Sequence, residues 1–163
     1  MEIRDTMLPV LRPLGGEEEV QAIREVIESG WWGKGPKVAE FEQKFAEMVG
    51  AKYAVAVTSA SHGQDLVMKA KGFKGIDVIN PTNIVDIRED DLNIDPDDVK
   101  KRLKRNSDAL IAVNMAGIPA PIDEIREFYD GLIIEDTAHS CYVEGAGKKG
   151  DVAVWSFQAV KTM

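Results

Sequence analysis

The sequence concentrates its aliphatic residues in short runs separated by longer amphipathic stretches, and this pattern restricts the chain to few folds. Short apolar runs bounded by turn residues are typical of buried strands, and they occur at residues 53–57, 109–113, 132–134 and 152–157. Apolar residues repeat with helical spacing after Glu17, over 38–49, after Ser61, over 97–103 and from Ile122 onward. Strands that alternate with helices predict an α/β fold.

Chemically reactive side chains follow the last two of these runs. The run at 132–134 leads into Asp136 and His139, and the run at 152–157 contains Ser156 and leads to Lys161. An arbitrary lysine is usually a solvated surface residue. However, α/β proteins place their sites at the carboxyl ends of strands. We therefore expect an acid, an imidazole, a hydroxyl and an amine at neighbouring edges of one sheet.

This set of side chains suits pyridoxal phosphate. A partly desolvated lysine amine forms a Schiff base with an aldehyde, and Lys161 is the candidate for that role. A carboxylate keeps the ring nitrogen of the cofactor protonated, and Asp136 is the candidate for it. Ser156 and the hydroxyl-rich turn at 58–61, which opens a helix, are candidates for binding the phosphate. The alternative for that turn is an ordinary serine N-cap.

Metal and nucleotide sites fit the sequence less well. Residues 135–141 include an acid, a histidine and a cysteine, but a structural zinc site needs four ligands and His62 is distant in sequence. The acidic segment 90–98 lacks the glycine and the terminal glutamate of a calcium loop. A nucleotide-binding α/β module would be favoured by a Walker loop, which the sequence lacks. We expect no metal site.

Length and charge limit the domain count and the partners. The 163 residues allow one domain that folds as a unit. The formal net charge of -8 argues against binding to nucleic acid or anionic membranes. The single cysteine, Cys141, excludes an internal disulfide, and the first residues lack an apolar signal segment. Because no apolar run approaches the ~20 residues of a membrane span, we expect a soluble cytoplasmic protein.

Six motifs in register carry a family resemblance. They are GKGP at 33–36 with FEQKFA at 41–46, AVAVTSAS at 54–61, LNIDP at 92–96, VNMAGIPA at 113–120, IEDTAH at 134–139, and GD at 150–151 with SFQAVK at 156–161. Together they resemble the DegT-type sugar aminotransferases, a branch of the fold-type-I pyridoxal-phosphate enzymes. The resemblance implies the three-layer α/β/α large domain of that fold, present here in part.

The same resemblance implies roles for individual residues and for the whole protein. Lys161 would hold the cofactor, Asp136 would pair with the pyridinium nitrogen and His139 would lie near the ring hydroxyl. The remaining cofactor-binding positions would be Ser156, Gln158, Ala60 and Ser61. The implied reaction moves an amino group, supplied by glutamate, onto a nucleotide-linked keto-sugar in a homodimeric enzyme. The alternative is a relative or fragment of the same fold that binds the cofactor without catalysis and serves in assembly or regulation.

Several departures from the family pattern bear on these expectations. Ala60 and Ser61 stand where the family has glycine and threonine, and Asn114 stands where a histidine is common. Two apparent strands meet near Pro81 and Asn83 without room for a crossover, which indicates a shortened or omitted segment there. The resemblance also implies that the sequence is truncated after Lys161. We therefore expect residues 1–163 to comprise an N-terminal segment and a partial cofactor-binding large domain, without the C-terminal small domain. The exposed pair Trp31 and Trp32 would suit either a partner subunit or a ligand.

Overall fold

The computed structural model describes residues 15–73, 84–103, 109–141, 143–159 and 161. The chain divides into two compact units, residues 1–56 with 158–161 and residues 57–157 with 162–163. The expected division into an N-terminal segment and a partial large domain stays a prediction.

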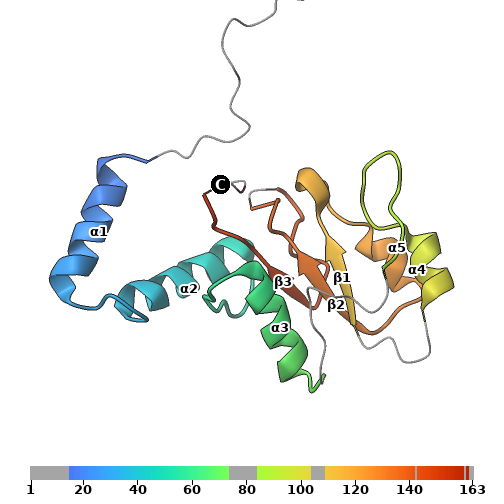
Figure 1. Cartoon of the computed structure of the whole chain (residues 1–163), viewed down its shortest axis with the longest axis horizontal. Helices are drawn as coiled ribbons and strands as arrows, with labels where there is room; N and C mark the ends of the chain where they lie inside the picture. Colours follow the sequence, from blue (N-terminus) through green and yellow to red (C-terminus); the bar gives the residue numbers. More distant parts are fainter. Residues whose placement is uncertain (1–14, 74–83, 104–108, 142, 160, 162–163) are drawn as a thin grey trace, which may run out of the picture. The chain divides into compact units, whose positions relative to one another are not determined.

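Two helices make up most of the described part of the first unit: α1 spans Glu17–Ser29 and α2 spans Pro36–Val49 (Figure 1). The Glu19 carboxylate accepts a hydrogen bond from the Gly16 amide at 2.6 Å, which satisfies a donor ahead of α1. Both helices end at a glycine with φ of +72°, Gly30 and Gly50, a conformation that residues with a side chain rarely adopt. The predicted helices are confirmed, and α2 begins two residues earlier than expected.

The predicted buried strand at 53–57 is wrong. These residues are not part of a strand, and Tyr53 and Val55 are exposed. The Ala56 amide instead donates to the Glu42 carboxylate on α2, at 2.8 Å. A strand exists only in a ladder, and none of the described strands pairs with this segment. On α2 itself, Phe45 is buried as expected for core, whereas Phe41 and Met48 are exposed.

The second unit contains a parallel three-stranded sheet in the order β1-β2-β3. Its strands are β1 (Ala109–Val113), β2 (Leu132–Asp136) and β3 (Val152–Val154), and Val113, Asp136 and Val154 lie opposite one another in register. The helices of this unit are α3 (Ala60–Ala70), α4 (Pro96–Arg102), η1 (Met115–Gly117) and α5 (Ile122–Arg126). The predicted parallel α/β arrangement is confirmed, although β3 ends three residues before the expected position.

Helices pack on both faces of the sheet, which gives the unit three layers (Figure 1). On one face, Ile133 of β2 packs in a core with Val99 of α4 and with Ile122 and Ile125 of α5. On the other face, Ile134 packs with Met68 of α3 and Val154 of β3. Neighbouring side chains of a strand point to opposite faces, so the central strand separates the two cores. The expected three-layer large domain is therefore observed in part.

The segment before α4 also differs from expectation. The apparent strand at 77–82 lies outside the described residues. In the apparent strand at 83–87, Ile87 forms only an isolated antiparallel bridge with Ile94. Asp95 is the N-cap of α4, because its side chain accepts from the Asp97 amide at 2.9 Å.

None of the helices within the described residues is both long and apolar enough to cross a bilayer.

Candidate functional site

Asp136 is the last residue of the central strand β2, at the carboxyl end of the sheet. Its Oδ2 accepts a hydrogen bond from Gln64 Nε2 at 2.6 Å, and its Oδ1 accepts from the Ala138 amide at 3.0 Å. The backbone of Asp136 is also held, because its carbonyl accepts from the Asn114 amide at 2.9 Å. The carboxylate is therefore fixed in one orientation by a donor on each oxygen.

The N-terminus of α3 lies against this end of the sheet. A Cβ atom placed on Gly63 would lie 3.2 Å from Cγ1 of Val154 at the end of β3. This close approach, together with the Gln64 contact, brings the first turn of α3 beside β2 and β3. The first turn of a helix presents amide groups without intrahelical partners, so it favours an anion such as a phosphate.

Two predicted phosphate-binding residues, Ala60 and Ser61, open α3. Ala60 is half-buried and Ser61 is exposed. The N-cap is Ser59, whose Oγ accepts from the His62 amide at 3.1 Å, and Thr58 Oγ1 lies 2.8 Å from His62 Nδ1. Ser59 therefore caps the helix, whereas Ser61 is the serine predicted to contact the phosphate. The N-cap alternative and the phosphate prediction thus concern different serines.

The turn after β2 positions His139. Thr137 is buried, and both its amide and its hydroxyl donate to the Val154 carbonyl, at 2.8 and 2.7 Å. Ser140 donates its hydroxyl to the Asn114 carbonyl at 3.2 Å. These bonds tie the turn to the ends of β3 and β1. His139 lies between the two anchors and is half-buried.

The predicted site residues divide between the two units. Asp136, His139, Ser156, Ala60 and Ser61 belong to the second unit, at or just beyond the carboxyl ends of β2 and β3 or in the first turn of α3. Gln158 and Lys161 belong to the first unit, where the Lys161 amide donates to the Gln158 carbonyl at 2.8 Å. The assignment of Lys161 and Asp136 to the same cofactor stays a prediction.

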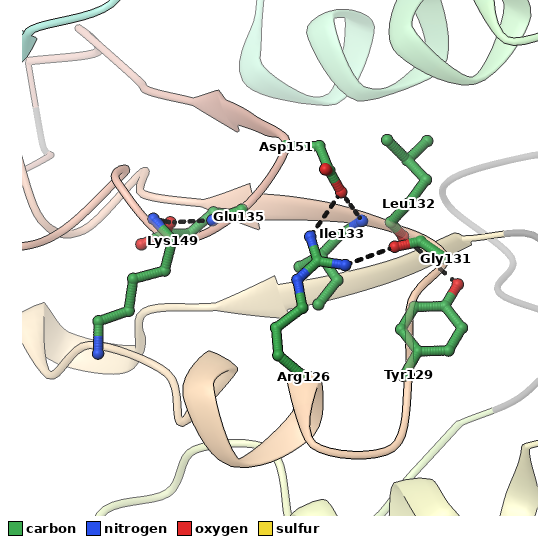
Figure 2. Close-up of polar contacts among 9 residues, drawn as sticks. Arg126, Tyr129, Gly131, Leu132, Ile133, Glu135, Lys149 and Asp151 are labelled. Atoms are coloured by element: carbon green, nitrogen blue, oxygen red, sulfur yellow. Dashed lines mark hydrogen bonds and ion pairs between the residues drawn. The ribbon is translucent and has the colours of Figure 1, made fainter.

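Glu135 is a buried acid that the sequence interpretation did not single out. Its Oε1 accepts from Asn114 Nδ2 at 2.9 Å and from the Gly147 amide at 2.6 Å. Its Oε2 accepts from the amides of Lys149 and Gly150 at 3.2 and 3.1 Å (Figure 2). A charged residue inside an apolar strand was the available signal, because buried carboxylates need several donors. Glu135 anchors the turn that leads into β3.

The glycines of that turn match the letters of a dinucleotide fingerprint, Gly145-x-Gly147-x-x-Gly150. A functional fingerprint follows a strand and opens a helix, with its amide groups directed at a pyrophosphate. Here the turn is followed by strand β3 instead, and two of its glycine amides bind Glu135. This structural context argues against a dinucleotide site.

At the opposite end of the sheet, Asp151 and Arg126 join the starts of β2 and β3 (Figure 2). Asp151 Oδ2 accepts from the Ile133 amide at 2.8 Å and from Arg126 Nη2 at 2.7 Å, while Arg126 Nη1 donates to the Gly131 carbonyl at 2.8 Å. Burial raises the pKa of Asp151, but these hydrogen bonds and the nearby cations outweigh burial and hold the pKa below its ordinary value. This pair is structural.

Metal-binding and thiol chemistry find little support in the described residues. They contain no group of three or more His, Cys, Asp or Glu side chains that could hold a metal ion. Burial raises the pKa of the Cys141 thiol, which disfavours the reactive thiolate.

Known proteins of one family resemble the chain in sequence. The sequence profile of the DegT/DnrJ/EryC1/StrS aminotransferase family matches residues 13–163. The chain is 36% identical to the spore coat polysaccharide biosynthesis protein SpsC of Bacillus subtilis (strain 168), over 98% of this chain and 48% of SpsC. That match runs over 185 residues, more than the 163 of this chain, so SpsC has additional residues within the matched region.

Solved structures of other proteins have a similar fold. DesI, whose crystal structure was determined in the presence of its TDP-sugar product, superposes with a TM-score of 0.82 and 27% identity, over 98% of this chain and 47% of DesI. The PLP form of Spr1654 from Streptococcus pneumoniae shares the fold, with a TM-score of 0.84 and 23% identity over 94% of this chain and 50% of Spr1654. The chain therefore spans about half the length of the relatives it matches.

Proposed function

Because the chain belongs to the DegT/DnrJ/EryC1/StrS aminotransferase family, we propose that it forms the cofactor-binding part of a pyridoxal-phosphate-dependent aminotransferase. The observation that carries this proposal is the setting of Asp136. Its carboxylate ends the central strand, is oriented by a donor on each oxygen, and lies at the sheet end against which the first turn of α3 packs. The fixed carboxylate suits the protonated ring nitrogen of the cofactor, and the first turn of α3 suits its phosphate.

The residues present fit this cofactor by the chemistry of their side chains. Asp136 would accept a hydrogen bond from the protonated ring nitrogen. Ser61, Ser156 and the first-turn amides of α3 beginning at Ala60 would donate to the phosphate. His139 would lie near the ring hydroxyl. Gln158 would be a further cofactor-binding residue. When bound, the cofactor supplies an electron sink.

Lys161 is proposed to be the residue that holds the cofactor, through a Schiff base to its side-chain amine. The Lys161 amine would also act as the general base that takes the proton from the α-carbon of the amino donor. The same amine would return the proton as a general acid. Both steps need a lysine that is partly desolvated, because a fully hydrated ammonium is a poor nucleophile and a poor base at neutral pH.

The substrate is proposed to be a keto-sugar carried on a nucleotide, with glutamate as the amino donor. The relatives support the sugar, because SpsC acts in polysaccharide biosynthesis and DesI was solved with its TDP-sugar product. We further propose a cytoplasmic homodimer. The side chains of Trp31 and Trp32 are 62% and 76% exposed. Such exposed aromatic side chains support the proposal, because a partner subunit could cover them.

The proposal is tested by comparing the visible absorbance of the wild-type chain and of Lys161→Ala after addition of pyridoxal phosphate. We expect the wild-type chain to turn yellow with pyridoxal phosphate, to be bleached by borohydride, and to retain the label at Lys161 in a peptide map. Lys161→Ala should bind no cofactor covalently, whereas Lys148→Ala, which removes an exposed lysine of the turn before β3, should behave as wild type. A colourless wild-type chain would refute the proposal. A chain that binds the cofactor but turns over no glutamate would indicate the non-catalytic alternative.

A further inference from the structure

We propose that Gln64 is a positioning residue that sets the direction of the Asp136 carboxylate toward the ring nitrogen of the cofactor. This inference rests on the proposed function and extends it to a residue outside the six motifs that resemble the family. The two residues are 72 positions apart in the sequence, and Gln64 Nε2 lies 2.6 Å from Asp136 Oδ2.

The contact is protected from water. The exposed fraction of Gln64 is 5%, so little solvent competes for its amide. A buried amide without a partner is costly, and the Asp136 carboxylate provides the partner. With Ala138 donating to Oδ1, each carboxylate oxygen has one protein donor and retains capacity to accept another hydrogen bond. Rotation of the carboxylate would break both bonds.

Helix geometry delivers Gln64 to this position. Gln64 and Met68 lie four residues apart and therefore on one face of α3, and Met68 packs in the core with Ile134 and Val154. Gly63 lets the start of the helix approach β3, because a Cβ atom there would lie 3.2 Å from Val154. The packing that buries Met68 thus also aims Gln64 at the end of β2.

A neutral amide suits this task better than a cation. Arginine or lysine at the same place would form an ion pair with Asp136 and compete with the protonated ring nitrogen for its charge. The amide of Gln64 donates one hydrogen bond and leaves the negative charge in place. The carboxylate is therefore oriented without being neutralised.

The experiment compares Gln64→Met and Gln64→Glu with wild type in the full chain. Gln64→Met keeps an unbranched side chain of similar length and removes the donor, and we expect pyridoxal phosphate to bind about tenfold more weakly. Gln64→Glu places a second carboxylate against Asp136, so binding at pH 8 should weaken further. It should recover toward pH 5.5, because two adjacent carboxylates share a proton that restores the donor.

The matched control is Gln43→Met on α2. This change removes an exposed amide-to-carboxylate hydrogen bond, from Gln43 Nε2 to Glu47 Oε1 at 3.0 Å, and should leave cofactor affinity unchanged. Thermal unfolding of each apo variant separates loss of packing from loss of positioning. A purely structural Gln64 would lower stability in both variants without the recovery at low pH. Affinities within twofold of wild type at every pH would overturn the proposal.

A second readout does not involve the cofactor. In the apo chain, the side-chain amide resonances of Gln64 should move in Asp136→Ala, because the strong acceptor is removed. Resonances that stay in place would overturn the proposal even if the chain binds pyridoxal phosphate. If the wild-type chain binds no cofactor, the proposed function fails, and the amide resonances alone decide whether Gln64 holds Asp136.

Discussion

At the scale of single residues, the neighbours Glu135 and Asp136 lie on opposite faces of β2 and have different roles. Side chains along a strand alternate between faces. Asp136 shares the face of Ile134 and meets α3 through Gln64, whereas Glu135 shares the opposite face with Ile133. One acid is proposed to serve the cofactor, and the other holds the turn before β3.

We expect Glu135→Gln to lower the free energy of unfolding by about 2 kcal/mol. Both carboxylate oxygens of Glu135 face N–H donors only, four in total. Whichever way the new amide is oriented, its NH₂ group meets two donors instead of accepting from them. Urea unfolding of the two proteins measures the difference.

The control for this prediction is Glu144→Gln, an equal charge change at an exposed position, which should alter the unfolding free energy by less than about 0.5 kcal/mol. Equal effects of the two substitutions would contradict the role assigned to Glu135.

At the scale of elements, the starts of β2 and β3 are joined to the end of α5 by Asp151 and Arg126. Gly150 permits this close junction because it has no side chain. A Cβ atom at this position would lie 3.0 Å from both the Ile133 carbonyl oxygen and Glu135 Cβ. The two strands therefore approach closely at this point, where Asp151 accepts from the Ile133 amide. The anchored ends set the register in which Asp136 lies opposite Val154.

We expect Asp151→Asn to lower stability at neutral pH by about 1 kcal/mol, since the pair with Arg126 is partly exposed and Asn can still accept from Ile133. The pKa of Asp151 is lower in the folded chain than in the unfolded chain. Its stabilising effect is therefore complete above the unfolded carboxyl pKa of about 3.9 and disappears as the pH falls through the folded value. The variant should show a flatter decline of stability below about pH 4.

Denaturant unfolding over a pH series checks this prediction, with Asp123→Asn as the control. Asp123 pairs with Lys149 at the surface, and its side chain is 75% exposed, so its removal should have little effect at any pH. A pH profile of Asp151→Asn that parallels wild type would contradict the coupling.

At the scale of the whole molecule, binding of the proposed cofactor is linked to folding. The proposed cofactor-binding residues are brought together only in the folded chain. A ligand that binds the folded chain and not the unfolded chain stabilises the folded chain.

We therefore expect pyridoxal phosphate at about 100 times its dissociation constant to stabilise the wild-type chain by about 2.7 kcal/mol. The increment should be smaller in Lys161→Ala at the same concentration, because the covalent link is lost. Thermal unfolding with a titration of the cofactor measures both effects. An unfolding temperature that does not respond to the cofactor in wild type would count against the site.

The sequence by itself determined the elements whose signals are local. The parallel strands β1 to β3, the helix start at Glu17 and the family membership were all readable from short motifs and from periodicity. Such signals are properties of contiguous residues. The strand predicted at 53–57 failed for the same reason, because an apolar run shows strand propensity but does not supply a pairing partner.

Only the tertiary structure decided which distant side chains meet. The bond between Gln64 and Asp136 joins residues 72 positions apart, and Glu135 binds amides 12 to 15 positions away. Neither contact leaves a periodic trace in the sequence. Both depend on how closely α3 and the turn before β3 pack on the sheet, and that distance follows from three-dimensional packing.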